Sequence, residues 1–263
     1  MIIESPFELS DPSDADAYLL ALETSGKYGS IAVTDPTGTI QTRDLPTTSG
    51  SARSLAHSIS ILLESMGLKA RQLRCIALLS GPGSFTGLRV GVATAKALAY
   101  ANRIPIVELD TLEVIHEQWR YANPSSNAWV HSILDAYRGQ LFIRSVAPAR
   151  TPTQTCTSNI DAALRDIVKL ETGNRHILIG PGIERVQSYL TSSEAAEEIV
   201  LASKQWILNH QPYTIPHAEA VAKLGRSKWN RGEVTDAFSV SPRYFRGSAA
   251  EEKAALTEGS RIV

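Results

Sequence analysis

The sequence has no long hydrophobic run and only two cysteines. No apolar stretch approaches the roughly 20 residues that a membrane-spanning helix requires, so we expect a soluble protein. Residues 1–16 carry five acidic side chains but neither a basic stretch nor a long apolar one, which excludes a secretory signal and predicts a cytoplasmic protein. Cys75 and Cys156 stand far apart, without a cysteine or histidine at ligand spacing, so neither a disulfide framework nor a zinc site is expected.

Positive charge is not in excess. Lysine and arginine number 26 against 27 aspartate and glutamate residues, for a net charge of -1. Binding to phosphates needs clustered basic residues, so the composition excludes a protein that binds nucleic acid over its whole surface. Binding through a local basic patch is still open. The six histidines include no pair four residues apart, the spacing that places two imidazoles on one helix face. This argues against a helical two-histidine metal site, although distant residues can converge in space.

The hydrophobic period changes along the chain and predicts an α/β protein of two lobes. Short apolar runs predict strands at residues 18–22, 29–35, 40–45, 75–79, 104–109, 128–134, 140–147, 176–179 and, as an edge strand, 242–246. Apolar residues at helical spacing predict helices at residues 54–66, 86–102, 110–121, 159–170, 183–190 and 216–231. The turn-forming run at residues 123–127 marks a lobe boundary. We therefore expect a disordered acidic leader at 1–16, an N-terminal lobe at 17–122, a C-terminal lobe at 123–247 and a flexible tail at 248–263.

The order of the expected elements is repeated, more loosely, in the second lobe. Three strands come first, and helices and strands then alternate. This is the layout of the acetate and sugar kinase, Hsc70 and actin superfamily (ASKHA), a two-lobed α/β fold with mixed sheets flanked by helices. From the order of elements alone, another α/β arrangement stays open.

A glycine-rich turn, SGPGSFTGLR at residues 80–89, separates a predicted buried strand from a helix. Backbone N–H groups at a helix N-terminus can hold an anion. However, the glycines lack the dinucleotide-binding spacing, no Gly-Lys-Ser/Thr follows, and Pro82 removes one N–H group. Nucleotide binding and a structural turn both stay open, and the structural turn is favoured. Ser84 does not stand at the centre of a G-x-S-x-G elbow, so a hydrolase of that kind is rejected.

The helix after this turn has small residues at every fourth position: Gly87, Gly91, Ala95 and Ala99. Glycine inside a helix costs about 1 kcal/mol relative to alanine, so Gly91 needs a compensating gain, for which close packing is the natural source. Packing inside the chain and packing against a partner both stay open. Because the helix is apolar nearly all round, we expect the sheet to cover one face, and the helix at 54–66 and a partner protein to share the rest.

Four stretches together resemble the TsaB (YeaZ) family of subunits for tRNA threonylcarbamoyladenosine biosynthesis. They are LETS at residues 22–25, GPGSFTGLR at 81–89, LDAYRG at 134–139 and YFR at 244–246. The likeness runs from about residue 18 to residue 252, and the second stretch is the specific one. Many relatives have Asp in place of Glu23, and His-Ser-Glu where this chain reads Ser51-Ala52-Arg53. The second departure lies directly before the predicted helix at 54–66.

The resemblance implies an ASKHA-like fold and a role in forming N6-threonylcarbamoyladenosine 3′ of the anticodon, in tRNAs that read codons beginning with A. In the family this subunit is not the catalyst. It forms a heterodimer with the homologous TsaD, which holds the metal and transfers the threonylcarbamoyl group; TsaE, an ATPase, joins them. The resemblance therefore implies no catalytic, metal or cofactor residue here, and indirect contact with tRNA. The candidate partner interface comprises Leu55, Ile59, Leu62, Leu63, Gly83, Phe85, Gly87, Val90, Gly91, Thr94, Ala95 and Leu98.

Two other functions stay open. Glu23 and Asp135 follow or end predicted strands, where kinases of the superfamily place carboxylates for Mg²⁺ and base chemistry, so an autonomous ASKHA phosphotransferase, or a peptidase-like enzyme, is the alternative. Hydrogen bonding in turns is the favoured role of both carboxylates. A homodimer through the same helical face, in the absence of the partner, is the third hypothesis.

Overall fold

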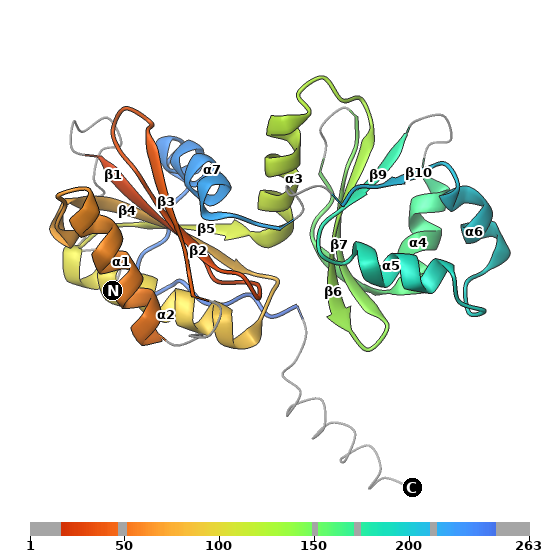
Figure 1. The fold of residues 1–263 in the computed structure, drawn as a ribbon, viewed down its shortest axis with the longest axis horizontal. Coiled ribbons are helices and arrows are strands. Elements are labelled where there is room, and N and C mark those ends of the chain that lie inside the picture. The colour runs from red at the N-terminus through yellow and green to blue at the C-terminus, as the bar shows by residue number, and fades with distance from the viewer. Residues whose placement is uncertain (1–16, 47–51, 149–151, 171–174, 211–214, 246–263) are drawn as a thin grey trace, which may run out of the picture.

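The computed structural model describes residues 17–46, 52–148, 152–170, 175–210 and 215–245. It contains two lobes, each built on a five-stranded mixed sheet (Figure 1). No helix within these ranges combines the length and apolarity of a membrane span. The predicted leader and tail lie outside the described residues.

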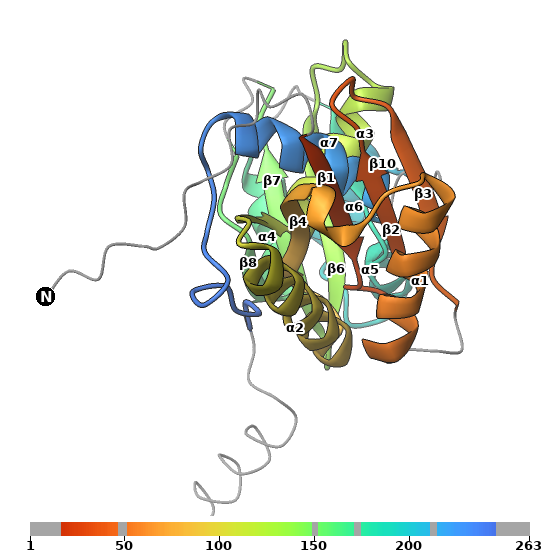
Figure 2. The same cartoon turned by 90° about the vertical axis from the view of Figure 1, so that its left-hand side faces the viewer.

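The first lobe has the strand order β3-β2-β1-β4-β5. Its strands are β1 (Tyr18–Glu23), β2 (Ser30–Thr34), β3 (Ile40–Asp44), β4 (Leu73–Gly81) and β5 (Ile106–Asp110). The first three pair antiparallel, as a meander, and β4 and β5 continue the sheet in parallel. One face of this sheet is covered by α1 (Ala52–Ser65) and α2 (Phe85–Asn102), which lie side by side (Figure 2). The short 3-10 helix η1 (Ala70–Gln72) precedes β4.

The second lobe repeats this strand order, as β8-β7-β6-β9-β10. Its strands are β6 (Trp129–Tyr137), β7 (Gln140–Val146), β8 (Cys156–Asn159), β9 (His176–Ile179) and β10 (Trp206–Leu208). Its outer helices are α4 (Ile160–Lys169), α5 (Ile183–Leu190) and α6 (Glu197–Ser203), whereas α3 (Thr111–Ala122) lies between the two sheets (Figure 1). The repeated topology confirms the predicted two-lobed ASKHA fold.

Both faces of the central strands are covered, which explains their continuous apolar sequence. Along β1, Leu20 and Leu22 face the core under α1 and α2, whereas Leu19 and Ala21 face a second core on the opposite side. All four side chains are at most 1% exposed. The first sheet is therefore the centre of a three-layer lobe.

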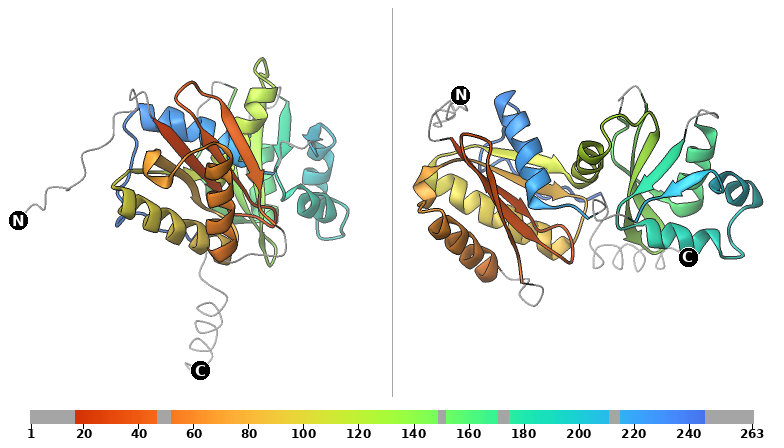
Figure 3. Two further views of the ribbon diagram at one scale, coloured as in Figure 1. Left: turned by 60° about the vertical axis from the view of Figure 1, so that its left-hand side comes forward. Right: turned by 45° about the horizontal axis from the view of Figure 1, so that its top comes forward.

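The third layer comes from the far end of the chain, α7 (Ala218–Asn230). Its buried Val221 and Trp229 belong to the same core as Leu19 of β1, and Figure 3 (right) shows α7 on the first lobe. Gly225 lies so close to Ala77 of β4 that a β-carbon there would overlap it. The prediction that placed all of residues 123–247 in the second lobe is therefore corrected, because the apolar face of α7 covers the side of the first sheet that α1 and α2 leave open.

Residues 234–245, here called the strap, continue from α7 across the first lobe. Thr235 and Ile106 of β5 exchange two backbone hydrogen bonds of 2.8 and 2.7 Å. Lys96 of α2 then donates from Nζ to the carbonyls of Phe238 and Val240, both at 3.1 Å. The strap thus follows one flank of α2.

The end of the strap joins the first lobe to the second. The N–H of Arg243 donates to the carbonyl of Ser80 at the end of β4, at 2.7 Å. Two residues later the carbonyl of Phe245 accepts a hydrogen bond from Oγ1 of Thr157 in β8. The predicted edge strand at 242–246 is wrong for its described residues, because the strap makes single bonds to two sheets here rather than a ladder with one.

Besides η1, three short elements have no counterpart in the sequence analysis: β8, α6 and β10. They have four, seven and three residues. The sequence of β8, CTSN, has no apolar run, and the few residues of α6 and β10 give only a weak pattern. β6 and β7, which correspond to the predicted strands at 128–134 and 140–147, form an antiparallel hairpin whose turn residues Tyr137, Arg138 and Gly139 all have positive φ angles.

The N-terminus of α2 is anchored on the turn that follows β1. Ser84 caps the helix, since its Oγ accepts a hydrogen bond from the N–H of Gly87 at 3.3 Å. The N–H of Ser84 donates in turn to the carbonyl of Ser25 at 2.6 Å. The glycine-rich turn therefore serves here to dock the helix on the turn after β1.

The small residues of α2 face the inside of the lobe. A β-carbon at Gly87 would overlap the carbonyl oxygen of Thr24, and one at Gly91 would overlap its Oγ1. Ala95 and Ala99 are fully buried in the core below. Of the two alternatives for this stripe, packing inside the chain is the one that the structure supports.

A pair of stacked histidines lies inside the second lobe. Nδ1 of His131 is 2.8 Å from Oγ of Ser145, and Nε2 of His131 is 3.1 Å from Nδ1 of His176. The two rings are stacked, with centroids 5.4 Å apart. His131 is fully buried, and burial lowers its pKa to about 3.

We expect Gly87→Ala to lower the free energy of unfolding by about 1–3 kcal/mol, because the added methyl group would overlap the main chain at Thr24. In an open helix the same change would stabilise by about 1 kcal/mol, so the sign of the effect is decisive. Urea unfolding measures it. Ala93→Leu, at an exposed position of the same helix, is the control and should change stability by less than about 0.5 kcal/mol. A stabilised Gly87→Ala variant would contradict this packing.

We expect the second lobe to lose stability as the pH falls from 6.5 towards 3, because an unfolded histidine protonates near 6.5 whereas His131 stays neutral down to a pKa of about 3. The loss should be about 1.4 kcal/mol per pH unit. In urea unfolding across this range, wild type should therefore lose stability more steeply than His131→Asn. His57→Asn, at an exposed histidine, should follow the wild type. Parallel curves for wild type and His131→Asn would show that the buried imidazole has no such effect.

Candidate functional site

Several of the predicted interface residues lie inside the first lobe. Leu55, Ile59, Leu62 and Leu63 of α1 are only 2–4% exposed and pack on the first sheet. Ala95 of α2 is fully buried. Their assignment to a contact surface is corrected, because the apolar stripe of an amphipathic helix covers its own sheet first.

The predicted glycines face the turn after β1. The position of a β-carbon on Gly83 is occupied by Ser25, and Gly87 and Gly91 meet Thr24. The space into which side chains at these positions would project is therefore occupied by this chain itself. Their absent side chains make room for this chain's own turn.

Four predicted residues remain at or near the surface of α2: Phe85, Val90, Thr94 and Leu98. Phe85 is 37% exposed, and the other three are half-buried. Val90 and Leu98 pack against the edge of the core beneath α1 and α2. These residues therefore border an open surface of the helix.

The open surface consists of small residues between the α1 flank and the strap flank of α2. We call it the outer face of α2, and its residues follow one line along the helix: Thr86, Val90, Ala93, Ala97 and Ala101. Val90 is half-buried and the other four are exposed. Of these residues, the candidate partner interface names only Val90, because it follows the more regular glycine stripe, although the apolar character of the whole helix also indicated this face.

The strap covers the other flank of α2 with an aromatic and cationic cluster. The rings of Phe85 and Tyr244 lie 4.9 Å apart, and the guanidinium of Arg89 lies 3.7 Å from the centre of the Phe85 ring. Nε of Arg89 also donates to the hydroxyl of Tyr244 at 2.7 Å. The helix is thus held by the turn, the sheet, α1 and the strap, and the described residues leave its outer face uncovered.

The two strand-end carboxylates make local hydrogen bonds. Oε1 of Glu23 accepts from both N–H and Oγ of Ser25, each at 2.7 Å, and Oδ1 of Asp135 accepts from the N–H of Tyr137. Glu23 is fully buried, and burial raises its pKa to about 7. This supports the favoured role of both groups in turns. In the ranges that the structure covers, no three side chains of His, Cys, Asp or Glu gather where they could hold a metal ion.

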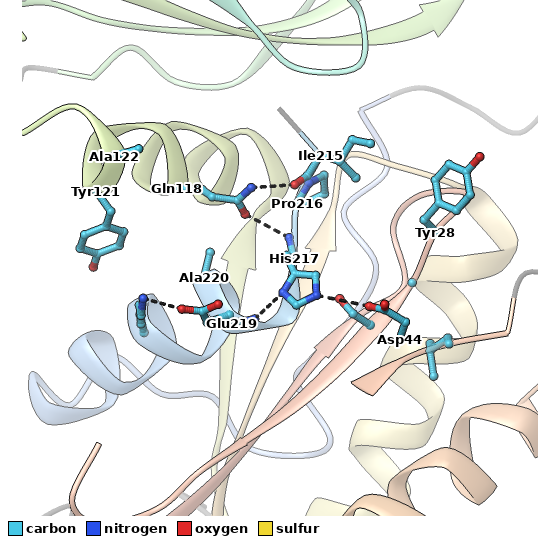
Figure 4. A pocket seen from close by; sticks show the side chains of 14 residues that line it. Tyr28, Asp44, Gln118, Tyr121, Ala122, Ile215, Pro216, His217, Glu219 and Ala220 are labelled. Carbon is cyan, nitrogen blue, oxygen red and sulfur yellow. Dashed lines mark hydrogen bonds and ion pairs between the residues drawn. The ribbon is translucent and has the colours of Figure 1, made fainter. Parts of the chain in front are cut away.

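A cleft of about 760 Å³ lies on the side of the first sheet that faces away from α1 and α2. It is bordered by the start of β2, the end of β3, the second half of α3 and the start of α7 (Figure 4). Its lining residues are Tyr28, Gly29, Ser30, Asp44, Leu45, Gln118, Tyr121, Ala122, Ile215, Pro216, His217, Glu219, Ala220 and Lys223. They come from three distant parts of the chain. No sequence pattern connects them, which is why the sequence analysis missed the cleft.

Side-chain and backbone hydrogen bonds fix one wall of the cleft. Gln118 of α3 donates to the carbonyl of Ile215 at 2.8 Å and accepts from the N–H of His217 at 3.2 Å. His217 caps α7 through Nδ1, which accepts from the N–H of Glu219. Figure 4 shows these groups on the same wall as Asp44, which lies 3.4 Å from Nε2 of His217. These hydrogen bonds link the second half of α3 to the start of α7 beside the cleft.

The sequence of this chain is similar to those of known proteins. A family model described as TsaD, tRNA N6-adenosine threonylcarbamoyltransferase, matches residues 47–172. The tRNA threonylcarbamoyladenosine biosynthesis protein TsaB of Haemophilus influenzae is 29% identical over 89% of this chain and 96% of its own length. TsaB of Bacillus subtilis is 26% identical over 74% of this chain and 80% of its own.

A solved structure shares the fold. YeaZ from Pseudomonas aeruginosa superposes with a TM-score of 0.66 over 87% of this chain and 99% of its own, at 21% sequence identity. This likeness covers both lobes. Together with the two relatives named TsaB, which align over most of their lengths, it confirms the resemblance to the TsaB (YeaZ) family found in the sequence.

Proposed function

We propose that this chain is a non-catalytic partner subunit in the formation of threonylcarbamoyladenosine in tRNA. The modified base is the adenosine 3′ of the anticodon in tRNAs that read codons beginning with A, and the protein acts in the cytoplasm. It forms a heterodimer with a TsaD-like catalytic homologue, a TsaE-like ATPase joins them, and tRNA is reached through the complex. Support comes from the relatives named TsaB and from the TsaD family model that matches residues 47–172.

The outer face of α2 is the observation that carries the proposed partner role. Thr86, Val90, Ala93, Ala97 and Ala101 form a line without charge or bulk, so the backbone of a second helix can approach closely. The charged residues of the helix, Arg89 and Lys96, are engaged by the strap on one flank. An apolar strip on a rigidly held helix, bordered by polar groups, is typical of a protein contact.

The small, uncharged residues of the outer face of α2 suggest a test by substitution. We expect Ala97→Arg to weaken association with the TsaD-like protein at least about tenfold, because it places a bulky cation where a helix should pack. Its fold should be unchanged, since Ala97 is exposed. Co-purification measures association, and tRNA threonylcarbamoylation with each protein omitted in turn measures activity. Leu201→Arg, at an exposed position of α6, is the control and should bind as wild type.

Modification is expected only when both chains are present, and Ala97→Arg should reduce it in parallel with binding. If this chain alone transferred the group, or if the two proteins never associated, the proposed function would fail. Association through this face between two copies of the chain, with no binding to the TsaD-like protein, would likewise refute the heterodimer.

A further inference from the structure

Exposed apolar side chains gather at the cleft shown in Figure 4. Tyr28, Tyr121 and Ile215 line it and are 52%, 47% and 42% exposed. Small-molecule sites usually enclose about 300–1,000 Å³, with mainly apolar walls and a few polar groups that fix orientation. The cleft, at about 760 Å³, has this form. It lies on the α7 side of the first sheet, away from the outer face of α2.

The polar groups of the cleft do not suit an anion. The start of α7 is the obvious place for one, but its N–H groups are already engaged. The N–H of Ala218 donates to Oγ of Ser30 at 2.9 Å, that of Glu219 to Nδ1 of His217 at 3.3 Å, and that of Ala220 to the carbonyl of His217 at 3.0 Å. No donor of this first turn is left for a carboxylate or phosphate.

The charges that line the cleft favour a cation. They are Asp44, Glu219 and Lys223, and Nζ of Lys223 lies 2.7 Å from Oε1 of Glu219. The unbalanced charge is therefore that of Asp44, whose side chain is 86% exposed. Because Nδ1 of His217 accepts a hydrogen bond, its proton lies on Nε2, which faces Oδ1 of Asp44. Within the described ranges, the other oxygen of Asp44 has no donor.

The rings add a second attraction. Tyr28 and Tyr121 stand at opposite ends of the cleft, and between them lie Pro216 and Ala220 (Figure 4). Three cations lie near these rings. Lys27 and Arg120 do not line the cleft, whereas Lys223 does, 5.6 Å from the centre of the Tyr121 ring and paired with Glu219. An apolar group can therefore lie between the rings while a donor reaches the free side of Asp44.

We propose that this cleft binds a ligand with a cationic hydrogen-bond donor on an apolar body. The cation pairs with Asp44, and the apolar body packs between Tyr28 and Tyr121. Two sources share this chemistry: a free small amine, and a lysine or arginine side chain beside an apolar residue in a segment of another protein. The inference does not depend on the proposed tRNA function.

Amide NMR titration of the full chain tests it with four probes. Phenethylamine and N-acetyl-Leu-Arg-amide carry the proposed cation, and 3-phenylpropionate and N-acetyl-Leu-Glu-amide are anions of matched shape. We expect saturable shifts around Gln118 and His217 with the two cations, and binding at least about tenfold weaker with the anions. Tighter binding of the peptide would identify a protein segment as the source, and tighter binding of the amine a free small molecule.

Variants identify the groups responsible. Asp44→Asn should weaken binding of the cations about two- to fivefold, as expected for an exposed ion pair. Tyr121→Ala should weaken it by at least a similar factor, because the ring is removed. Asp166→Asn, at an exposed carboxylate of α4, is the control and should leave binding unchanged. None of these variants should alter association with the TsaD-like protein, so the two proposals fail separately.

Absence of saturable shifts, equal binding of cations and anions, or an Asp44→Asn variant that binds as wild type would each overturn the proposal. Shifts confined to residues away from the cleft would overturn it as well.

Discussion

The contact between the turn after β1 and the glycine face of α2 is the constraint on which the candidate interface depends. Glu23 holds Ser25 by two hydrogen bonds of 2.7 Å, and Thr24 lies against Gly87 and Gly91. The contact has a cost, because a buried carboxyl with a pKa raised to about 7 and two helical glycines are each unfavourable in isolation. As a result the inner side of α2 packs against this chain, whereas the outer face of α2 is exposed.

The first sheet separates two surfaces with different chemistry. On the α2 side, the residues of the outer face of α2 are small and uncharged, which suits the close approach of a protein helix. On the α7 side the cleft combines aromatic rings with an unbalanced Asp44, which suits an amphipathic cation. The C-terminal segment contributes to both surfaces. Its helix α7 forms a wall of the cleft, and the strap that follows α7 packs on the flank of α2. A single C-terminal segment therefore supports both surfaces.

Sequence reasoning recovered the order of the long elements because burial produces a period in the residues. It did not predict which element packs against each buried residue. For the stripe of Gly87, Gly91 and Ala95, packing inside the chain and packing against a partner were both open, and the stripe meets the turn after β1 and the core. In the same way, α7 has an apolar face that any sheet could cover, and its return to the first lobe follows from tertiary packing. The cleft joins residues such as Asp44 and Tyr121 that no local pattern relates.

A double-mutant cycle between Thr24 and Gly91 tests the central contact most directly. A β-carbon at residue 91 would overlap Oγ1 of Thr24, so Gly91→Ala should cost about 1–3 kcal/mol of unfolding free energy in the wild-type background. In a Thr24→Ala background the obstructing oxygen is gone, and the cost should fall by about 1 kcal/mol or more. The account predicts this coupling. The same cost in both backgrounds would contradict it.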